Sequence, residues 1–569
     1  MSKLMTMSEA VARYVPDGSS VAISLALEPL IPFAAAHEII RQQRRNLTLI
    51  GPISDILFDQ LIGAGCVERV TAAWAGNVSE GLGYCYRRAT EKAIPRAITV
   101  EEHSNFTIGL ALLAASLGSP YIPTRSTLGS DIPGHNTAFR LERSPLDGTP
   151  LLLVPALSPD VTIVHAQRSD EDGNAHLWGN VGICEEAVLA AKDVILVAEE
   201  IVEREVIVSD PNRVLGPSYK VRAVVHEPWG AHPSAVQGYA NRDHLFYHEY
   251  HERTRSVEGF QDWLEEWVLR VPTRAGYVKK LGEERMQRLR VKKHRYAAAV
   301  DYGYEGRKSE VEYTPQELMV VCAARQVQDG ERVFVGMRLP LLAFALAKRT
   351  HAPHCVGLFE TGILRDTPAA ELLYTMGDAP NICGALWATG TVKVIGLMAA
   401  GEVQLGFIGG AEIDRYGNLN TTAIGNWRRP TARLPGSGGA ADIASLSHRL
   451  AIIMQHDRHR LREKVDYVTS PGYGYPDEQG PAGAAWRERV GLPRGGPAAL
   501  ITTLAVFTFD RQNGEAVLQS YHPGTTVEEV QARTGWTLRL ADDCRETVPP
   551  SMEELKVIRE CDPEGKWTR

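Results

Sequence analysis

An internal repeat limits the folds open to this 569-residue chain more than any other feature. Residues 15–40 and 327–349 each begin with a Val-x-Asp-Gly turn, continue as an alternating strand and pass a proline into an alanine-rich helical stretch. Residues 164–179 and 409–425 form a second pair, in which an Asp-x-x-Gly-Asn turn follows an apolar strand. Because both pairs occur in the same order, duplication explains them better than chance, and the sequence predicts two related domains.

Short apolar segments alternate with amphipathic helical stretches in both halves. Continuous apolar strands separated by helices are typical of parallel sheets that are covered on both faces. The predicted strands include residues 46–51, 69–75, 160–166, 193–202, 332–337, 393–399, 404–410 and 450–457. We therefore expect an α/β protein of two homologous open α/β domains with mainly parallel sheets, in which ligands bind at the carboxyl ends of strands.

The boundary between the halves is predicted at residues 297–313, which would link a domain of residues 1–296 to one of residues 314–569. Residues 277–296 are basic at helical spacing, and a solvated helix is favoured over a nucleic-acid-binding arm. Periodicity is then lost until Thr314-Pro315-Gln316-Glu317, which has the pattern of a helix capping box.

Composition excludes several classes of function. A formal charge of -8 gives no reason to expect a nucleic-acid or membrane partner. The eight cysteines lack CxxC or CxH spacing, which argues against a zinc site or a redox pair and fits a reducing cytosol. The amino-terminal residues lack the apolar core of a signal peptide, and no apolar run approaches the roughly 18 residues that span a bilayer. We expect a cytoplasmic protein without a metal site.

Glu360 is the first candidate for chemistry. Residues 355–359 read as a short buried strand, so Glu360 lies at its carboxyl end, and Gly362 permits a tight turn there. A carboxylate in this position is ionised at pH 7 unless strongly perturbed, and it can attack an activated acyl carbon. Taken alone, the tripeptide Glu-Thr-Gly is a weak signal and favours a solvent-facing glutamate at the end of a strand.

A glycine run and two polar segments supply further candidates. Residues 436–439 (Gly-Ser-Gly-Gly) enter a helical stretch, so that their N–H groups could bind an oxyanion or a phosphate, or the run could be a flexible connection. In the first half, Arg125 could bind an anion through two hydrogen bonds. His103 and Ser104 lie in a second polar segment, where His103 is a substrate contact or a structural histidine.

Taken in order, these motifs resemble the family I CoA-transferases of the glutaconate CoA-transferase type. Residues 1 to about 295 resemble the family's α subunit in stretches such as PLIPFAAAHEIIRQ, VEEHSN and GAHPSAVQGYANRD. Residues from about 315 onward resemble its β subunit in ETGILRD, FIGGAEIDRYGNLNTTAIG and GSGGAADIAS. The resemblance implies that two subunits, each with the same open α/β fold, are fused here in one polypeptide.

The resemblance also implies site residues and partners. Glu360 falls at the position of the family's catalytic glutamate, with Thr361 replacing a serine, and Gly438 and Gly439 match its oxyanion loop, with Gly409 and Gly410 expected nearby. The partners would be an acyl-CoA and a carboxylic acid acceptor, with coenzyme A as a substrate, no permanently bound cofactor, and a homodimer or homotetramer as the assembly. Apart from the resemblance, Arg125 and His103 indicate a dicarboxylate or another polar acid as substrate, with Ser104 as a further candidate contact.

One departure bears on the substrate. Many relatives carry a Gly-Gly-Phe loop after the first strand, where this chain has Ser24-Leu25-Ala26-Leu27-Glu28.

Two alternative functions stay open from the sequence. One is an acyl-CoA hydrolase of the ring-opening, steroid-degrading branch, which lacks the glutamate of the motif, and the other is a non-catalytic ligand-binding protein of related fold.

Overall fold

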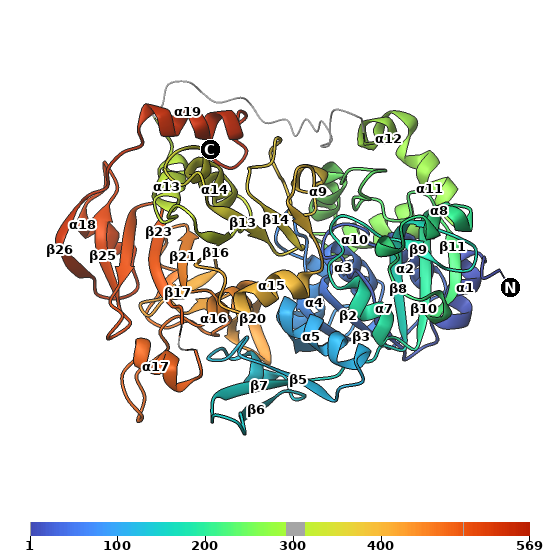
Figure 1. The fold of residues 1–569 in the computed structure, drawn as a ribbon, viewed down its shortest axis with the longest axis horizontal. Helices are drawn as coiled ribbons and strands as arrows, with labels where there is room; N and C mark the ends of the chain where they lie inside the picture. Colours follow the sequence, from blue (N-terminus) through green and yellow to red (C-terminus); the bar gives the residue numbers. More distant parts are fainter. Residues whose placement is uncertain (1, 292–312, 493) are drawn as a thin grey trace.

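The computed structural model describes residues 2–291, 313–492 and 494–569. Figure 1 shows the two halves side by side, with the first half in blue and green and the second in yellow to red. The amino terminus lies at the outer side of the first half, and the carboxyl terminus lies beside α13 and α14 of the second.

The first half is built around an eight-stranded sheet. Seven of its strands follow the order β11-β10-β8-β1-β2-β3-β4 and run parallel to their neighbours. Their bounds are Ser20–Ala22 (β1), Leu47–Ile53 (β2), Val67–Trp74 (β3), Thr99–Glu102 (β4), Val161–Ser169 (β8), Asp193–Ile201 (β10) and Val221–His226 (β11).

The second half is built around a ten-stranded sheet with a parallel centre, in the order β13-β12-β16-β21-β23. Antiparallel strands extend it at both edges, β14 and β15 beside β13, and β24 and β25 beside β23, where β26 then pairs parallel with β25. The bounds are Arg332–Phe334 (β12), Val356–Phe359 (β13), Ile363–Arg365 (β14), Trp387–Ala388 (β15), Leu405–Ile408 (β16), Arg449–Met454 (β21), Pro497–Thr502 (β23), Ala505–Phe509 (β24), Ala516–Tyr521 (β25) and Arg539–Glu546 (β26).

The two sheets repeat one arrangement. The order β11-β10-β8-β1-β2 corresponds to β23-β21-β16-β12-β13, strand for strand and in the same chain sequence. The predicted Asp-x-x-Gly-Asn turns also match, since the Asp170 carboxylate accepts the Asn174 amide at 2.9 Å and the Asp414 carboxylate accepts the Asn418 amide at 3.1 Å. The predicted duplication and the α/β fold with mainly parallel sheets are therefore confirmed.

Helices cover both faces of each sheet, as predicted. In the first half, neighbouring strand residues such as Ile163 and Val164 belong to different cores, because successive side chains point to opposite faces. One face of that sheet packs on α1 (Met7–Tyr14), α2 (Phe33–Arg41), α3 (Asp55–Gly63), α4 (Tyr84–Lys92), α9 (His244–Arg253), α10 (Val257–Leu264) and α11 (Arg274–Leu281), and the other on α5 (Asn105–Ser116) and α7 (Cys184–Ala190). The second sheet packs on α13 (Pro315–Ala324), α14 (Leu339–Arg349) and α19 (Met552–Cys561) on one side, and on α15 (Thr391–Ala399) and α16 (Ala440–Leu446) on the other.

Helix α5 belongs to the cores of both halves. Ile108 and Leu112 pack with the first sheet, whereas Phe106 and Leu110 pack with α15, α16 and the second sheet. In Figure 1, α5 and α15 lie next to each other where the halves meet. The amino-terminal end of α5 is therefore held at the junction between the two sheets.

A buried polar group also joins the halves. The Glu102 carboxylate at the end of β4 accepts hydrogen bonds from Arg433 at 2.7 Å, the Trp427 indole at 2.8 Å and the Tyr467 hydroxyl at 2.9 Å. Each of these three donors belongs to the second half. Such fully paired buried charges fix the relative position of the elements that carry them.

One strand prediction was wrong, because residues 393–399 lie in the helix α15. Periodicity cannot separate a short apolar strand from a buried helical segment of the same length. The buried residues of α15 are Thr391, Val394, Ile395 and Met398, a spacing that places them on one face of a helix.

The region between the halves is only partly described. The capping box at Thr314 is confirmed, since its hydroxyl accepts the Glu317 amide and the Glu317 carboxylate accepts the Thr314 amide. The basic stretch forms α11 and α12 (Glu283–Leu289) up to residue 289. The predicted linker of residues 297–313 lies outside the described residues except for Tyr313.

Candidate active site

Glu360 directly follows β13, at the carboxyl end of the strand as predicted. The chain then turns back at once into the antiparallel β14, with the Gly362 amide donating to the Phe359 carbonyl at 3.0 Å. Gly362 has a φ of +99°, and a Cβ there would lie 1.9 Å from the Thr389 carbonyl oxygen, so only glycine fits this turn. The Thr391 hydroxyl donates to the Glu360 carbonyl at 3.0 Å and fixes its backbone from the other side.

The Glu360 carboxyl group is almost completely buried and is held by a residue of the first half. The Asn105 side-chain amide donates to Glu360 Oε1 at 2.5 Å. Asn105 is the first residue of α5, and its own backbone N–H donates to the Gly438 carbonyl at 3.0 Å. The junction position of α5 thus brings a side-chain N–H donor of one half onto the carboxyl group of the other.

The predicted glycine loop lies on the end of β3. The Gly438 amide donates to the Ala73 carbonyl at 3.0 Å, and the Ala75 amide donates to the Pro435 carbonyl at 2.8 Å. The amide of Gly439, at the amino-terminal cap of α16, hydrogen-bonds Glu360. The structure therefore brings Gly439 to Glu360, whereas the Gly438 amide, which was expected to act with it, is already bonded to β3.

Burial perturbs the ionisation of Glu360. Loss of hydration raises the pKa of its carboxyl group to about 8, with a further increase from the charges of Asp442 and Glu28. The hydrogen bonds from Asn105 and Gly439 favour the ionised form and oppose this increase only in part. The carboxyl group is therefore mostly protonated at pH 7, unlike an ordinary glutamate.

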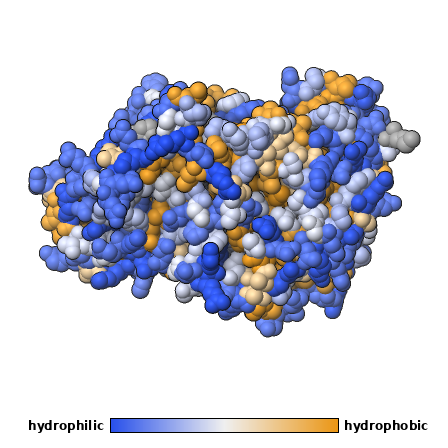
Figure 2. Space-filling view, turned by 90° about the horizontal axis from the view of Figure 1, so that it is seen from below, coloured by the Kyte–Doolittle hydropathy of each residue, from blue (hydrophilic) through white to orange (hydrophobic). Residues whose placement is uncertain are grey.

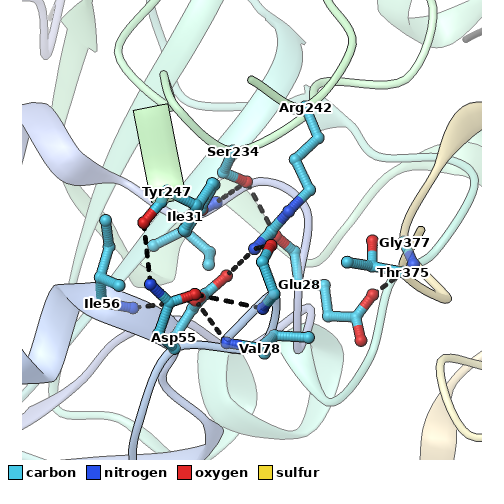
Figure 3. Close-up of polar contacts among 12 residues, drawn as sticks. Glu28, Ile31, Asp55, Ile56, Val78, Ser234, Arg242, Tyr247, Thr375 and Gly377 are labelled. Atoms are coloured by element: carbon cyan, nitrogen blue, oxygen red, sulfur yellow. Dashed lines mark hydrogen bonds and ion pairs between the residues drawn. The ribbon is translucent and has the colours of Figure 1, made fainter. Parts of the chain in front are cut away.

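Glu28 lies in the loop that departs from the family pattern. Its carboxylate accepts the Gly377 amide of the second half, and burial raises its pKa to about 7. Figure 3 shows Glu28 directed at Gly377 beside a second buried group, in which Arg242 and Asp55 pair at 2.7 Å. The departing loop therefore brings an additional acidic side chain into the surroundings of Glu360.

Two other predicted site residues, Ser104 and His103, bond to groups other than Glu360. Ser104 caps α5, and its hydroxyl donates to Asp442 at 2.5 Å. His103 is buried beside Phe139 and contacts the Thr107 hydroxyl at 3.2 Å, and burial lowers its pKa to about 3, so its ring is neutral. Among the described residues, neither Ser104 nor His103 has a hydrogen bond to Glu360.

Arg125 and the Gly409-Gly410 pair lie further from Glu360. Arg125 follows β5 (Tyr121–Thr124) and interacts with Asp147. Gly409 and Gly410 follow β16, on the same sheet edge as Glu360 but two strands away from β13. Within the described parts of the chain, no hydrogen bond or ion pair joins any of these three residues to Glu360.

Sequence reasoning did not single out Asn105, Asp442 or the Glu28 carboxyl group. Asn105 carried a usable signal, because a Ser-Asn pair directly before an apolar run of helical length predicts a helix amino terminus. The partners of Asp442 and Glu28 lie more than 300 residues away in the chain, and no local pattern identifies such contacts.

Two duplicated α/β halves that meet around a buried carboxyl group define the structural class of this protein. Within that class, the chain belongs to the coenzyme A transferase family, whose sequence model matches residues 4–227 and 316–533. The resemblance that the motifs indicated is thus confirmed over both halves, and the protein is a CoA-transferase by family.

Individual subunits of known CoA-transferases each match about half of the chain. One component of the 3-oxoadipate CoA-transferase of Pseudomonas knackmussii is 40% identical over 268 residues, which cover 47% of this chain and 94% of that component. One component of the glutaconate CoA-transferase of Acidaminococcus fermentans, of the complementary type, is 37% identical over 256 residues, which cover 44% of this chain and 92% of that component. These matches agree with a fusion of the two subunit types in one polypeptide.

A solved structure shares the fold of the whole chain. The acyl-CoA transferase of Escherichia coli O157:H7, solved as a thioester complex with CoA, superposes with a TM-score of 0.66 at 15% identity. The match covers 96% of this chain and 95% of that one.

The molecular surface carries both hydrophilic and apolar side chains. Figure 2 shows hydrophilic side chains over most of the face seen from below, with apolar side chains in separate groups. None of the helices in the described parts of the chain has the length and hydropathy that crossing a bilayer requires.

Proposed function

We propose that the protein transfers coenzyme A from an acyl-CoA to a free carboxylic acid, with Glu360 as the covalent carrier. The observation that supports this most strongly is that N–H donors from both halves converge on the Glu360 carboxyl group, the Asn105 side chain and the Gly439 backbone. Glu360 also lies at the carboxyl end of a parallel strand, where open α/β sheets bind their ligands.

The first half-reaction takes two steps. The ionised Glu360 oxygen attacks the acyl carbon of the donor, and the C–S bond breaks to give an acyl–glutamyl anhydride and CoA thiolate. The thiolate then attacks the Glu360 side-chain carbonyl carbon, the bond from that carbon to the bridging oxygen breaks, and the donor acid leaves as its carboxylate. Glu360 is left as a thioester of CoA, and an acceptor carboxylate reverses these steps to leave as the new acyl-CoA.

The two N–H donors face the carboxyl group of Glu360. They are therefore placed to stabilise the tetrahedral intermediates that form on the Glu360 side-chain carbon when thiolate or acceptor attacks it. Removing one such donor costs about 3–4 kcal/mol in comparable sites. Burial of Glu360 also limits the access of water, which would otherwise hydrolyse the glutamyl thioester.

Trapping the covalent intermediate tests the proposal. After incubation with a panel of acyl-CoA donors and reduction with borohydride, mass spectrometry should find the Glu360 peptide reduced at the side-chain carbonyl. A Glu360→Gln variant treated in the same way controls for reduction elsewhere. Steady release of CoA without an acceptor, and with no modified Glu360, would indicate an acyl-CoA hydrolase instead. A screen of donors against acceptors then identifies the acids.

The reaction should also depend on pH in a defined direction. Only the ionised Glu360 attacks, and burial raises its pKa to about 8. The ionised fraction, and with it kcat/KM, should therefore fall about tenfold per pH unit below pH 8 and reach a plateau above it. Initial rates between about pH 6 and pH 10 measure this, and a rate that is constant across the lower part of that range would contradict it.

A further inference from the structure

Asp442 makes contacts that the reaction described above does not explain. It lies in the first turn of α16, three residues after Gly439, and its side chain is completely buried. Its carboxylate accepts the Ser104 hydroxyl at 2.5 Å, the Ser126 hydroxyl, and the Phe106 backbone N–H at 3.1 Å. All three donors belong to the first half, and no lysine, arginine or histidine among the described residues forms an ion pair with Asp442.

These contacts enclose Asn105 on both sides. Ser104 and Phe106 are its direct neighbours in the chain, and both are bonded to Asp442. The backbone N–H of Asn105 donates to the Gly438 carbonyl at 3.0 Å. Three consecutive residues at the start of α5 are thus attached to the segment 438–442, and the middle one donates its side-chain amide to Glu360.

We propose that Asp442 is a positioning residue for CoA transfer, which holds the Asn105 amide against Glu360 and keeps a negative charge beside the Glu360 carboxyl group. The proposal rests on the covalent role of Glu360 proposed above. Asp442, a buried acid of the second half, aligns the Asn105 donor of the first half. The glycine loop and α5 therefore act on Glu360 as one unit.

The chemistry of the contacts explains why an acid is required at position 442. Three donors point at the two side-chain oxygens, and an ionised aspartate accepts all of them. An asparagine would turn an NH₂ group toward at least one of these donors, which would leave a buried N–H or O–H without an acceptor.

The charge of Asp442 acts on Glu360 as well. Burial is the main cause of the raised pKa of Glu360, and Asp442 and Glu28 are the charged groups that raise it further. Burial raises the pKa of Asp442 to about 7, below that of Glu360, so Asp442 ionises before Glu360 as the pH rises. A more basic carboxylate is a stronger nucleophile toward the acyl carbon. The negative charge opposes ionisation of Glu360, whereas the hydrogen bond from Asn105, which Asp442 holds in place, favours ionisation more strongly.

Asp442→Asn therefore has two expected effects, one on kcat and one on the pH profile. The value of kcat should fall about 10- to 100-fold with little change in KM, since Asn105 is no longer held in line with Glu360. The acid limb of the kcat/KM profile should move to higher pH, because the lost hydrogen bond from Asn105 lowered the pKa of Glu360 more than the charge of Asp442 raised it, whereas an Asp442 that acts through its charge alone would move the limb to lower pH. A loss of folded protein alone lowers the rate at every pH and leaves the limb in place.

Asp414→Asn is the matched control. Asp414 is also completely buried in the second half, and its carboxylate accepts the backbone amides of Tyr416 and Asn418, with no hydrogen bond to α5 among the described residues. This variant should lose thermal stability to a similar degree while the activity per folded molecule and the acid limb stay unchanged. An Asp442→Asn profile that coincides with the Asp414→Asn profile overturns the proposal.

Ser126→Ala provides a second test if Asp442→Asn does not fold. It removes one of the three donors and leaves the carboxylate in place, so kcat should fall about 3- to 10-fold, with a smaller shift of the acid limb in the same direction. Parental kinetics in Ser126→Ala would overturn the positioning role. Trapping the glutamyl adduct in the parent protein distinguishes failure of the positioning role from failure of the proposed function, because a missing adduct refutes the covalent mechanism itself.

Discussion

Replacing Glu360 with alanine is expected to lower kcat for CoA transfer by about 10⁴-fold or more, because the covalent carrier is removed and no other route connects the two half-reactions. Glu360→Asp keeps the charge but withdraws the carboxylate by one methylene from the Asn105 and Gly439 donors. A displacement of about 1 Å costs on the order of 100-fold in such sites, so this variant should retain a trace of transfer and release more CoA to water. Single-turnover assays of acyl transfer and of free CoA, in the presence and absence of acceptor, distinguish the two outcomes.

Glu360→Gln serves as the control for folding. Because the folded protein raises the pKa of Glu360 above its unfolded value, ionising this side chain costs stability, and the cost grows as the pH rises toward 8. The neutral glutamine avoids that cost, so the inactive variant should unfold at a higher temperature than the parent at about pH 9, with a smaller difference at about pH 6. An inactive variant that is less stable than the parent at the higher pH would indicate that activity was lost through misfolding.

Gly439→Ala should reduce kcat about 100- to 1000-fold. A Cβ at this position would lie 2.1 Å from Glu360 Oε1, so either the carboxyl group or the Gly439 amide has to move out of its hydrogen bond. The backbone of Gly439 has a φ of -91°, which alanine adopts without strain, so the clash with Glu360 is the direct cause of the loss.

Gly396→Ala is the matched substitution for this prediction. Gly396 lies inside α15, where an added Cβ would contact nothing within 4 Å among the described residues. Alanine should therefore leave kcat unchanged and stabilise the helix by about 1 kcal/mol. A Gly439→Ala enzyme that stays within about tenfold of the parent in kcat would show that the close approach of residue 439 to Glu360 is not required for the reaction.

The sequence was sufficient to predict the duplication, the buried strand before Glu360 and the glycine run before α16. These features depend on local patterns such as apolar alternation, turn residues and helix caps, which act over short stretches of chain. The error at residues 393–399 has the same origin, since a short apolar run contains too little periodicity to identify a helix.

The geometry around Glu360 depends on contacts that no local pattern contains. The Gly438 amide donates to β3 and not to Glu360, and Asn105 reaches Glu360 because α5 lies between the two sheets. His103 shows the opposite effect, because a titratable residue in a polar segment proved to be neutral and buried beside Phe139. The pairing of the halves decides the roles of Gly438 and Asn105, whereas burial among residues of the first half decides that of His103.

The continuity of the chain has a consequence for how the site is assembled. Asn105 and Glu360 come from opposite halves, which in the matched relatives correspond to separate polypeptides. Joining the halves covalently turns their encounter from a bimolecular into an intramolecular event, with an effective local concentration that dilution does not change. Formation of a complete site is then independent of enzyme concentration, and the two components are always made in equal amounts.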